Sequence, residues 1–386
     1  MPWKAFSVMS LRHEFVDMSQ EITVSLSELC RRFNVSRKTG YKWLKRYLEE
    51  GVQGLADRSR RPHRIRYHIP QADEDAIVCL RKKHPTWGAR RIRRRLQDSG
   101  SEKPPACSTI TTILHRHGLV DPEGPGGRQD WQRFEHPVPN GLWQMDFKAP
   151  VPTLAGPCQP LTILDDYSRF NLCLEALPNQ QTNEVQKTLT TTFRRYGLPN
   201  RLVVDNGSPW GSDAEHPYTP LTVWLIRLGI GVSHSRPYHP QTLGKEERFH
   251  RTLEHDLLSR FQWRDALHLQ AAFGPWRHEY NFERPHDALG LAVPASRYRP
   301  SLRCFPESPP TIEYPSEVSV RKVQQRGELC FRGRTFKISK AFCGYPIGLR
   351  PTTIDGVFDV LFCHQQVSQI DLRNTQKLLP MSSVHL

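Results

Sequence analysis

The feature that most constrains the fold is a change of pattern at residue 138, where strand-like alternation replaces helical periodicity. In the segment GLWQMDFK (141–148), large apolar residues alternate with polar ones, which is the period of a half-buried strand. The segments that follow predict two more strands, a helix, and a short buried strand ending at an acid: 160–170, 171–177, 182–197 and 202–207. This succession predicts an α/β core over residues 138–300, in which the strands at 142–148, 160–166 and 170–177 lie side by side in one sheet.

The length and charge of the chain indicate several domains and an anionic partner. The chain has 386 residues, more than one compact domain usually holds. Lys and Arg number 54 against 39 Asp and Glu, a net charge of +15, and most of the excess lies within residues 1–140. Such a balance favours nucleic acid, because neutralising phosphates releases condensed counterions. A merely basic soluble protein is the alternative that charge alone leaves open.

Residues 21–50 carry two helical patterns joined by a short turn and predict a helix-turn-helix domain over residues 1–62. Ser25 or Ser27 can cap the first helix, and Ser36 can cap the second. The apolar residues of the second helix predict its inward face: Tyr41, Leu44 and Leu48. The opposite face suits the major groove of DNA and provides four candidate contacts: Arg37, Lys38, Lys42 and Lys45. An ordinary helical hairpin with solvated charges is the alternative.

Residues 63–125 repeat the helical pattern and predict a second DNA-binding helical domain. The segment WGARRIRRRLQDSG (87–100) is denser in arginine than solubility requires. Its candidate DNA contacts are Arg90, Arg91, Arg94 and Arg95. The Gly- and Pro-rich sequence that follows predicts a flexible linker to the core, assigned to residues 126–137.

Beyond the core, a second linker and a small all-β domain are expected. Residues 301–315 are rich in proline, which favours an extended connection. Short strand patterns with hairpin signals follow, including a turn at Arg332–Gly333. Such strands predict a small β-barrel over residues 316–375.

Three acids within the core suit one kind of chemistry, the cleavage and transfer of phosphodiesters. Asp146 lies on the polar face of a strand, Asp205 ends a buried strand, and Glu247 lies in the first turns of a helix. Two divalent ions about 3.5–4 Å apart can activate an oxygen nucleophile, and they require clustered hard oxygen ligands. Taken singly, these acids could also be a surface strand residue, a turn residue and a helix-dipole partner.

Four segments in this order resemble the catalytic core of DDE-type insertion-sequence transposases of the retroviral-integrase superfamily: WQMDF, ILDDYSRF, DNG and HPQTLGKEERFHRTL. The resemblance covers residues 138–300. It implies a ribonuclease-H-like fold that binds two Mg²⁺ (or Mn²⁺) ions through the catalytic residues Asp146, Asp205 and Glu247. The helical N-terminal half matches the bacterial branch. The zinc-binding His/His/Cys/Cys module of the retroviral branch is not found, so no zinc is expected.

The family motif, and not helical periodicity, selects Glu247 over Glu246, because the third acid directly precedes Arg248–Phe249. The same helix provides candidate contacts to DNA phosphates: Lys245, Arg248 and Arg251. The adjacent acids Asp165–Asp166 point to opposite faces if they lie in a strand, so they are interpreted as structural or as residues that support the metal ligands.

These features predict a transposase that binds double-stranded DNA at element ends and at the target, and that catalyses strand cleavage and 3′-OH strand transfer. Strand transfer at two ends implies a homo-oligomer on DNA. Scattered cysteines and the lack of an apolar run for a membrane span indicate a cytoplasmic, nucleoid-associated protein. The alternative function is a DNA-binding repressor or capture protein with an inactive integrase-like core.

Overall fold

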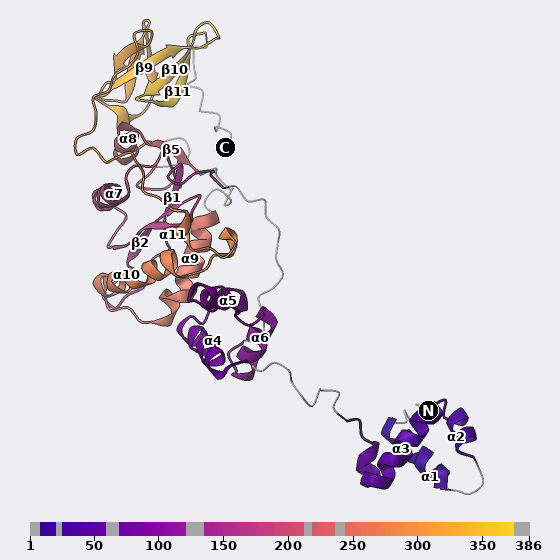
Figure 1. Ribbon diagram of the computed structural model, residues 1–386. Coiled ribbons are helices and arrows are strands. Elements are labelled where there is room, and N and C mark those ends of the chain that lie inside the picture. Colours follow the sequence, from indigo (N-terminus) through magenta and orange to yellow (C-terminus); the bar gives the residue numbers. More distant parts are fainter. Residues whose placement is uncertain are drawn as a thin grey trace. The chain divides into compact units, whose positions relative to one another are not determined.

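The structure separates into two compact units, residues 1–68 and residues 69–386. It is a computed structural model that describes residues 8–20, 25–58, 69–120, 135–211, 218–235 and 244–373. Most of the linker expected at 126–137 lies outside these ranges. The expected composition of helical N-terminal region, α/β core and all-β C-terminal region is confirmed (Figure 1). No helix among the described residues is long and apolar enough to cross a lipid bilayer.

The first unit is a helical bundle in which two helices begin at serine caps. The Ser25 side chain accepts a hydrogen bond from the Glu28 N–H (3.3 Å), and the Ser36 side chain accepts one from the Thr39 N–H (3.2 Å). Such caps satisfy amide groups that the first helical turn leaves unpaired. An additional N-terminal helix, which the sequence pattern did not predict, packs on them. The elements are α1 (Val8–Gln20), α2 (Leu26–Arg32), α3 (Arg37–Glu50) and η1 (Gly51–Leu55).

The inward face of α3 differs from the sequence prediction. Tyr41 is 62% exposed and Leu48 is 82% exposed, whereas Gly40 and Trp43 are buried. A Cβ at Gly40 would lie 2.5 Å from the Cys30 Sγ, so α3 approaches its neighbours most closely at the glycine. The prediction was wrong for Tyr41 and Leu48, whereas Leu44 is half-buried against the core of this unit. It did not consider that a glycine can mark the closest helix contact.

The second unit begins with three short helices that share a small apolar core. Trp87, Ile92 and Ile110 are fully buried in this core. The helices are α4 (Gln71–Lys83), α5 (Ala89–Asp98) and α6 (Cys107–Arg116). They belong to the same compact unit as the α/β core.

The α/β core is built on a five-stranded mixed sheet with strand order β3-β2-β1-β4-β5. The three strands expected from the alternating sequence lie side by side and are antiparallel, and β4 and β5 continue the sheet in parallel with β1. This arrangement confirms the predicted adjacency. The strands are β1 (Leu142–Phe147), β2 (Gln159–Asp165), β3 (Asn171–Leu177), β4 (Arg201–Val204) and β5 (Gly231–His234).

Helices cover both faces of this sheet. On one face, Trp143 and Met145 of β1 pack with residues of α7 and α8. On the other face, Leu164 and Leu174 pack with residues of α9 and α10. The helices are α7 (Thr182–Tyr196), α8 (Pro220–Arg227), α9 (Gly244–Asp256) and α10 (Ala266–Phe282), with the short elements η3 (Leu258–Arg260), η4 (Asp287–Leu289) and α11 (Pro294–Arg297).

The C-terminal region is all-β, as expected, but its described strands form two open sheets and not a closed barrel. One sheet has the order β11-β10-β9-β6, and the other is the β7–β8 hairpin, which turns at Arg332–Gly333. Their apolar residues join the cluster of the α/β core, so burial is achieved by packing and not by closure. The elements are β6 (Ser319–Lys322), β7 (Glu328–Phe331), β8 (Arg334–Lys337), η5 (Lys340–Phe342), β9 (Pro346–Pro351), β10 (Val357–Phe362) and β11 (Gln365–Asp371).

Candidate active site and DNA-binding surfaces

Asp146 and Asp205 come from neighbouring parallel strands at one end of the sheet. Gln144 of β1 is in register with Val203 of β4. Two residues further along both strands, this register sets Asp146 beside Asp205, which directly follows β4. Adjacent strands lie about 4.8 Å apart. Strand alternation directs Asp146 away from the face of the sheet that carries the buried Trp143. Helix α9 covers the face to which Asp146 points.

The electrostatics of these carboxylates show that they influence one another. Burial, the charge of Asp205 and, more weakly, the charge of Glu247 raise the pKa of Asp146 to about 7. Burial also raises the pKa of Asp205, although its Oδ1 accepts a hydrogen bond from the Gly207 N–H (3.2 Å). Mutual repulsion of this kind is what a bound divalent cation relieves.

Helix α9 runs alongside β1 on this face. At one end, the Lys148 Nζ pairs with the Glu254 Oε2 at 2.8 Å. At the other end, Lys245 and Gln144 both bind the carboxylate of Asp166. The steps from Gln144 to Lys148 along the strand and from Lys245 to Glu254 along the helix cover a similar length of about 13 Å. The contacts therefore fix α9 along its whole course over the strand.

The two adjacent glutamates of α9 differ in exposure. Glu247 is exposed, and its charge acts on Asp146. Glu246 is fully buried and accepts a hydrogen bond from the Thr162 Oγ1 (2.9 Å). Its other oxygen has no hydrogen-bond partner among the described residues. Burial, and then the charge of Asp146, raises the pKa of Glu246 well above its usual range. Both glutamates are near Asp146, so the choice of Glu247 stays a prediction from the motif.

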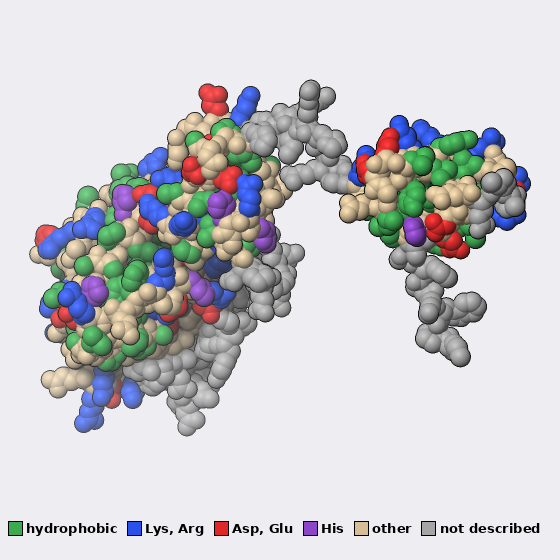
Figure 2. Space-filling model, turned by 90° about the horizontal axis from the view of Figure 1, so that it is seen from below, with side chains coloured by type: hydrophobic (Ala, Val, Ile, Leu, Met, Phe, Trp, Pro, Cys, Tyr) green, Lys and Arg blue, Asp and Glu red, His purple; other side chains and the backbone are tan. Residues whose placement is uncertain are grey.

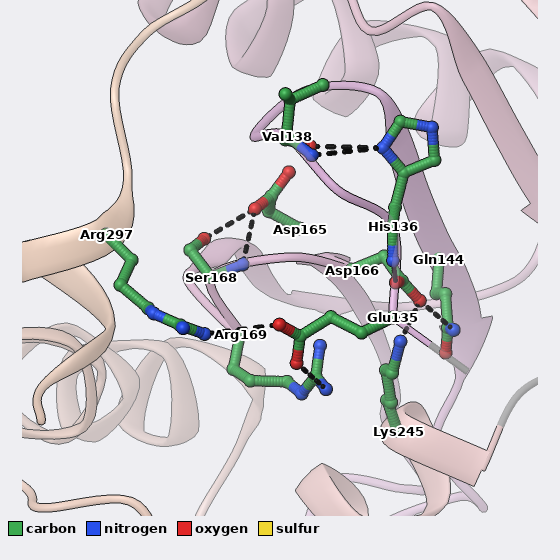
Figure 3. Close-up of polar contacts among 10 residues, drawn as sticks. All are labelled: Glu135, His136, Val138, Gln144, Asp165, Asp166, Ser168, Arg169, Lys245 and Arg297. Carbon is green, nitrogen blue, oxygen red and sulfur yellow. Dashed lines mark hydrogen bonds and ion pairs between the residues drawn. The ribbon is translucent and has the colours of Figure 1, made fainter. Parts of the chain in front are cut away.

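A buried polar network holds the start of α9 against the sheet (Figure 3). The carboxylate of Asp166, which is fully buried, accepts hydrogen bonds from the His136 N–H (2.7 Å) and the Gln144 Nε2 (2.8 Å) and pairs with Lys245. Lys245, a candidate phosphate contact in the sequence, is thus turned toward a protein carboxylate two positions before Glu247. Sequence reasoning missed this pairing, because only the fold brings the turn after β2 beneath α9.

The neighbouring acid, Asp165, stabilises the turn that follows β2. Its carboxylate accepts hydrogen bonds from the Asn140 N–H (2.7 Å) and from the N–H (2.8 Å) and hydroxyl (2.5 Å) of Ser168. Next in the turn, Arg169 pairs with Glu135 at 2.9 Å (Figure 3). Both acids of the adjacent pair are therefore bound to other parts of the chain.

The donor set fits hard divalent cations such as Mg²⁺, which bind carboxylate oxygens. Burial first, and then the negative charges of Asp205 and Glu247, raise the pKa of Asp146, so a cation bound here would relieve an unfavourable negative charge. As the side chains are placed, no group of three potential ligands among the described residues is close enough to hold an ion. Residues 236–243, which directly precede α9, lie outside the described ranges.

The candidate DNA contacts fall into two groups, those that are exposed and those that pair with acids of the protein. Among the exposed ones, basic side chains of the first unit gather along one edge of the right-hand body in Figure 2. The exposed candidates are Arg37, Lys38, Lys42, Lys45, Arg90, Arg248 and Arg251. The remaining candidates are partly buried and pair with protein acids: Arg91, Arg94, Arg95 and Lys245.

Comparison with protein families assigns domains to most of the chain. Two integrase core domain models match residues 136–240 and 228–294. A helix-turn-helix domain model matches residues 12–63, and a homeodomain-like domain model matches residues 39–114. The fold and these matches define an integrase-core protein with helix-turn-helix domains. Residues 318–378 match the C-terminal domain of IS481 family transposases.

Relatives of known sequence include two proteins of bacterial insertion elements. The chain is 23% identical over 176 residues to the IS407 uncharacterized 31.7 kDa protein of Burkholderia multivorans, covering 46% of this chain and 61% of that protein. It is 25% identical over 158 residues to the IS476 uncharacterized 39.2 kDa protein of Xanthomonas euvesicatoria (41% and 44%). It is 29% identical over 217 residues to the Gag-Pol polyprotein of baboon endogenous virus (54% and 12%). The chain thus spans less than two thirds of each relative.

Solved structures to which the chain is similar include retroviral integrases. A simian T-cell lymphotropic virus intasome in complex with a PP2A regulatory subunit has a TM-score of 0.36 at 16% identity, covering 75% of this chain and 96% of that chain. The catalytic core domain of BIV integrase has a TM-score of 0.32 at 21% identity (41% and 92%). The HTLV-2 integrase catalytic core domain in complex with magnesium has a TM-score of 0.33 at 14% identity (42% and 99%).

Proposed function

We propose that the chain binds the ends of a mobile DNA element and catalyses metal-dependent strand cleavage followed by 3′-OH strand transfer into target DNA. The observation that carries this proposal is the meeting of Asp146 and Asp205 at one end of the sheet, with the charge of Glu247 acting on Asp146. When bound there, Mg²⁺ or Mn²⁺ ions supply activation of the attacking oxygen and neutralise charge on the leaving oxygen.

In this proposal the chain positions groups and does not act as a nucleophile. Asp146, Asp205 and Glu247 hold the cations, and the paired strands fix the separation of the two aspartates. Arg248 and Arg251, exposed on the same helix as Glu247, bind phosphates of the DNA strand.

Recognition of the DNA ends is assigned to the helical N-terminal half. The helix-turn-helix of the first unit presents the N-terminal part of α3 to the major groove. Lys38 and Lys42 are exposed on this helix, and so is Tyr41, which the sequence placed inward. The active form would be a homo-oligomer assembled on double-stranded DNA in the cytoplasm, associated with the nucleoid.

A cleavage assay with the purified full chain tests the proposal. Duplexes carrying the ends of the chain's own element are incubated with Mg²⁺ or Mn²⁺, and scrambled duplexes and EDTA serve as controls. We expect nicks at the element ends that depend on the metal and on the sequence. Binding to the ends without cleavage in either metal would instead support a repressor or capture protein with an inactive core.

A further inference from the structure

Helix α5 has two arginine-bearing faces with different surroundings. Ile92 and Leu96 are buried in the core of the three short helices. At about 100° per residue, Arg90 and Arg94 together lie nearly opposite these residues, and Arg91 and Arg95 together lie on one flank. The four candidate arginines divide accordingly. The side chains of Arg90 and Arg94 are 56% and 39% exposed, whereas those of Arg91 and Arg95 are 17% and 27% exposed.

The less exposed pair reaches acids of the α/β core. The Arg91 Nη2 lies 2.8 Å from the Asp287 Oδ2, and the Arg95 Nη2 lies 2.9 Å from the Glu283 Oε2. Glu283 follows the last residue of α10, and Asp287 begins η4. Of the other two arginines, Arg94 pairs with Asp98 of its own helix. The Arg90 Nη1 lies 3.5 Å from the Asp287 Oδ1, which is a longer contact than that of Arg91, and the Arg90 side chain is largely exposed.

Two more polar contacts join the short helices to the core. The His84 side chain is 6% exposed, and its Nδ1 lies 2.8 Å from the Glu279 Oε1 of α10. The Thr86 hydroxyl donates a hydrogen bond to the Asp256 Oδ1 (2.6 Å). Asp256 is the last residue of α9, the helix that carries Glu247. The short helices therefore contact both helices that cover the catalytic face of the sheet.

We propose that Arg91 and Arg95 dock the short-helix segment (residues 69–120) onto the catalytic core, while Arg90 and Arg94 contact DNA phosphates. This assignment rests on the proposed function. DNA could engage Arg95 only by breaking its ion pair with the partly buried Glu283, and Arg91 only by breaking the shorter of the two arginine contacts of Asp287, and both losses are costly. Docking holds DNA bound by the short helices at a fixed place relative to α9, so these ion pairs position the element end for cleavage.

Matched double variants of the full chain on one helix separate the two roles. The slope of log affinity for end DNA against log salt falls by about 0.9 for each lost phosphate contact. We expect Arg90→Ala/Arg94→Ala to reduce this slope by about 1.8. We expect Arg91→Ala/Arg95→Ala to leave the slope unchanged and to reduce cleavage at saturating DNA at least tenfold.

The core side of the interface provides an independent test. Asp287→Asn/Glu283→Gln keeps the shape of both acids and leaves α5 intact, so it should reproduce the cleavage defect without changing the salt slope. In the DNA-free full chain it should also accelerate amide hydrogen exchange in α5, a result that does not depend on catalysis. Unchanged exchange, or a slope that falls by about 1.8 in Arg91→Ala/Arg95→Ala, would overturn the assignment. A wild-type chain that binds but never cleaves would refute the proposed function and leave the exchange and slope results to decide the docking.

Discussion

At the scale of single residues, the candidate site places acids where ionisation is unfavourable. The pKa of Asp146 is raised to about 7, and Glu246 is fully buried beside it. Clustered ionised acids destabilise the folded protein when no cation is bound, and a bound cation removes this cost. This balance leads to two predictions.

Replacing Asp146 by Asn should stabilise the metal-free protein, and more at pH 8 than at pH 5. The pKa of Asp146 is about 7 in the folded chain, compared with an ordinary value of 3.8, so the folded state holds the proton more tightly. Stability is therefore lost as the pH rises from about 4 to about 7, and Asn does not titrate. We expect the stabilisation to grow by on the order of 2 kcal/mol between the two pH values. Unfolding in EDTA measures this, and an equal gain at both pH values would contradict it.

The third carboxylate can be identified by comparing two isosteric variants. Glu247→Gln should abolish cleavage and leave end binding intact, because the amide keeps the shape but loses the charge that holds a cation. Glu246→Gln should retain cleavage, because a neutral amide can still accept the hydrogen bond from Thr162. Cleavage and end binding are measured for both proteins. Loss of cleavage in Glu246→Gln alone would show that Glu246 is the ligand.

At the scale of elements, the position of α9 depends on the ion pair between Lys245 and the buried Asp166. Lys245→Met should destabilise the protein by about 3 kcal/mol, because it leaves a buried carboxylate without its cation. It should reduce cleavage and leave the salt dependence of end binding unchanged. Arg248→Ala and Arg251→Ala, on the exposed side of the same helix, should each reduce the salt slope without destabilising the fold.

Chemical denaturation and salt titration of these three variants distinguish the roles. Lys245→Arg serves as the control, since it keeps the charge and should recover part of the stability and of the cleavage. If Lys245→Met had wild-type stability and a reduced salt slope, this result would show that Lys245 contacts DNA phosphates and does not stabilise α9.

Sequence pattern was sufficient for the elements whose side chains alternate between a buried and a polar face. The strands β1, β2 and β3 were expected as neighbours, and alternation alone placed Asp146 opposite Trp143. Pattern was not sufficient where contact depends on a residue with no side chain, as at Gly40, where α3 meets its neighbours. The pairing of Asp166 with Lys245 also could not be predicted, because it joins residues that only the tertiary fold brings together.

At the scale of the whole molecule, the two compact units separate the helix-turn-helix from the α/β core. The helix-turn-helix lies in the first unit, whereas the short helices α4–α6 share the second unit with the core and the C-terminal sheets. The first unit has its own buried core, which includes Leu29 and Trp43. A fragment of residues 1–68 should therefore fold alone and bind end DNA, with affinity that falls as salt rises. Competition with scrambled duplexes measures its specificity, and a fragment that folds but shows no preference would place recognition in the second unit.

The most direct test of the central claim is strand cleavage by Asp205→Asn in the full chain, with end binding measured on the same sample. Asp205 follows β4 beside Asp146, and after burial its charge is the largest cause of the raised pKa of Asp146. We expect the wild type to nick end DNA in Mg²⁺, and we expect the variant to bind the same DNA with nearly unchanged affinity but to produce no nicks. Cleavage by Asp205→Asn at the wild-type rate would show that the meeting of carboxylates at this end of the sheet is not the catalytic site.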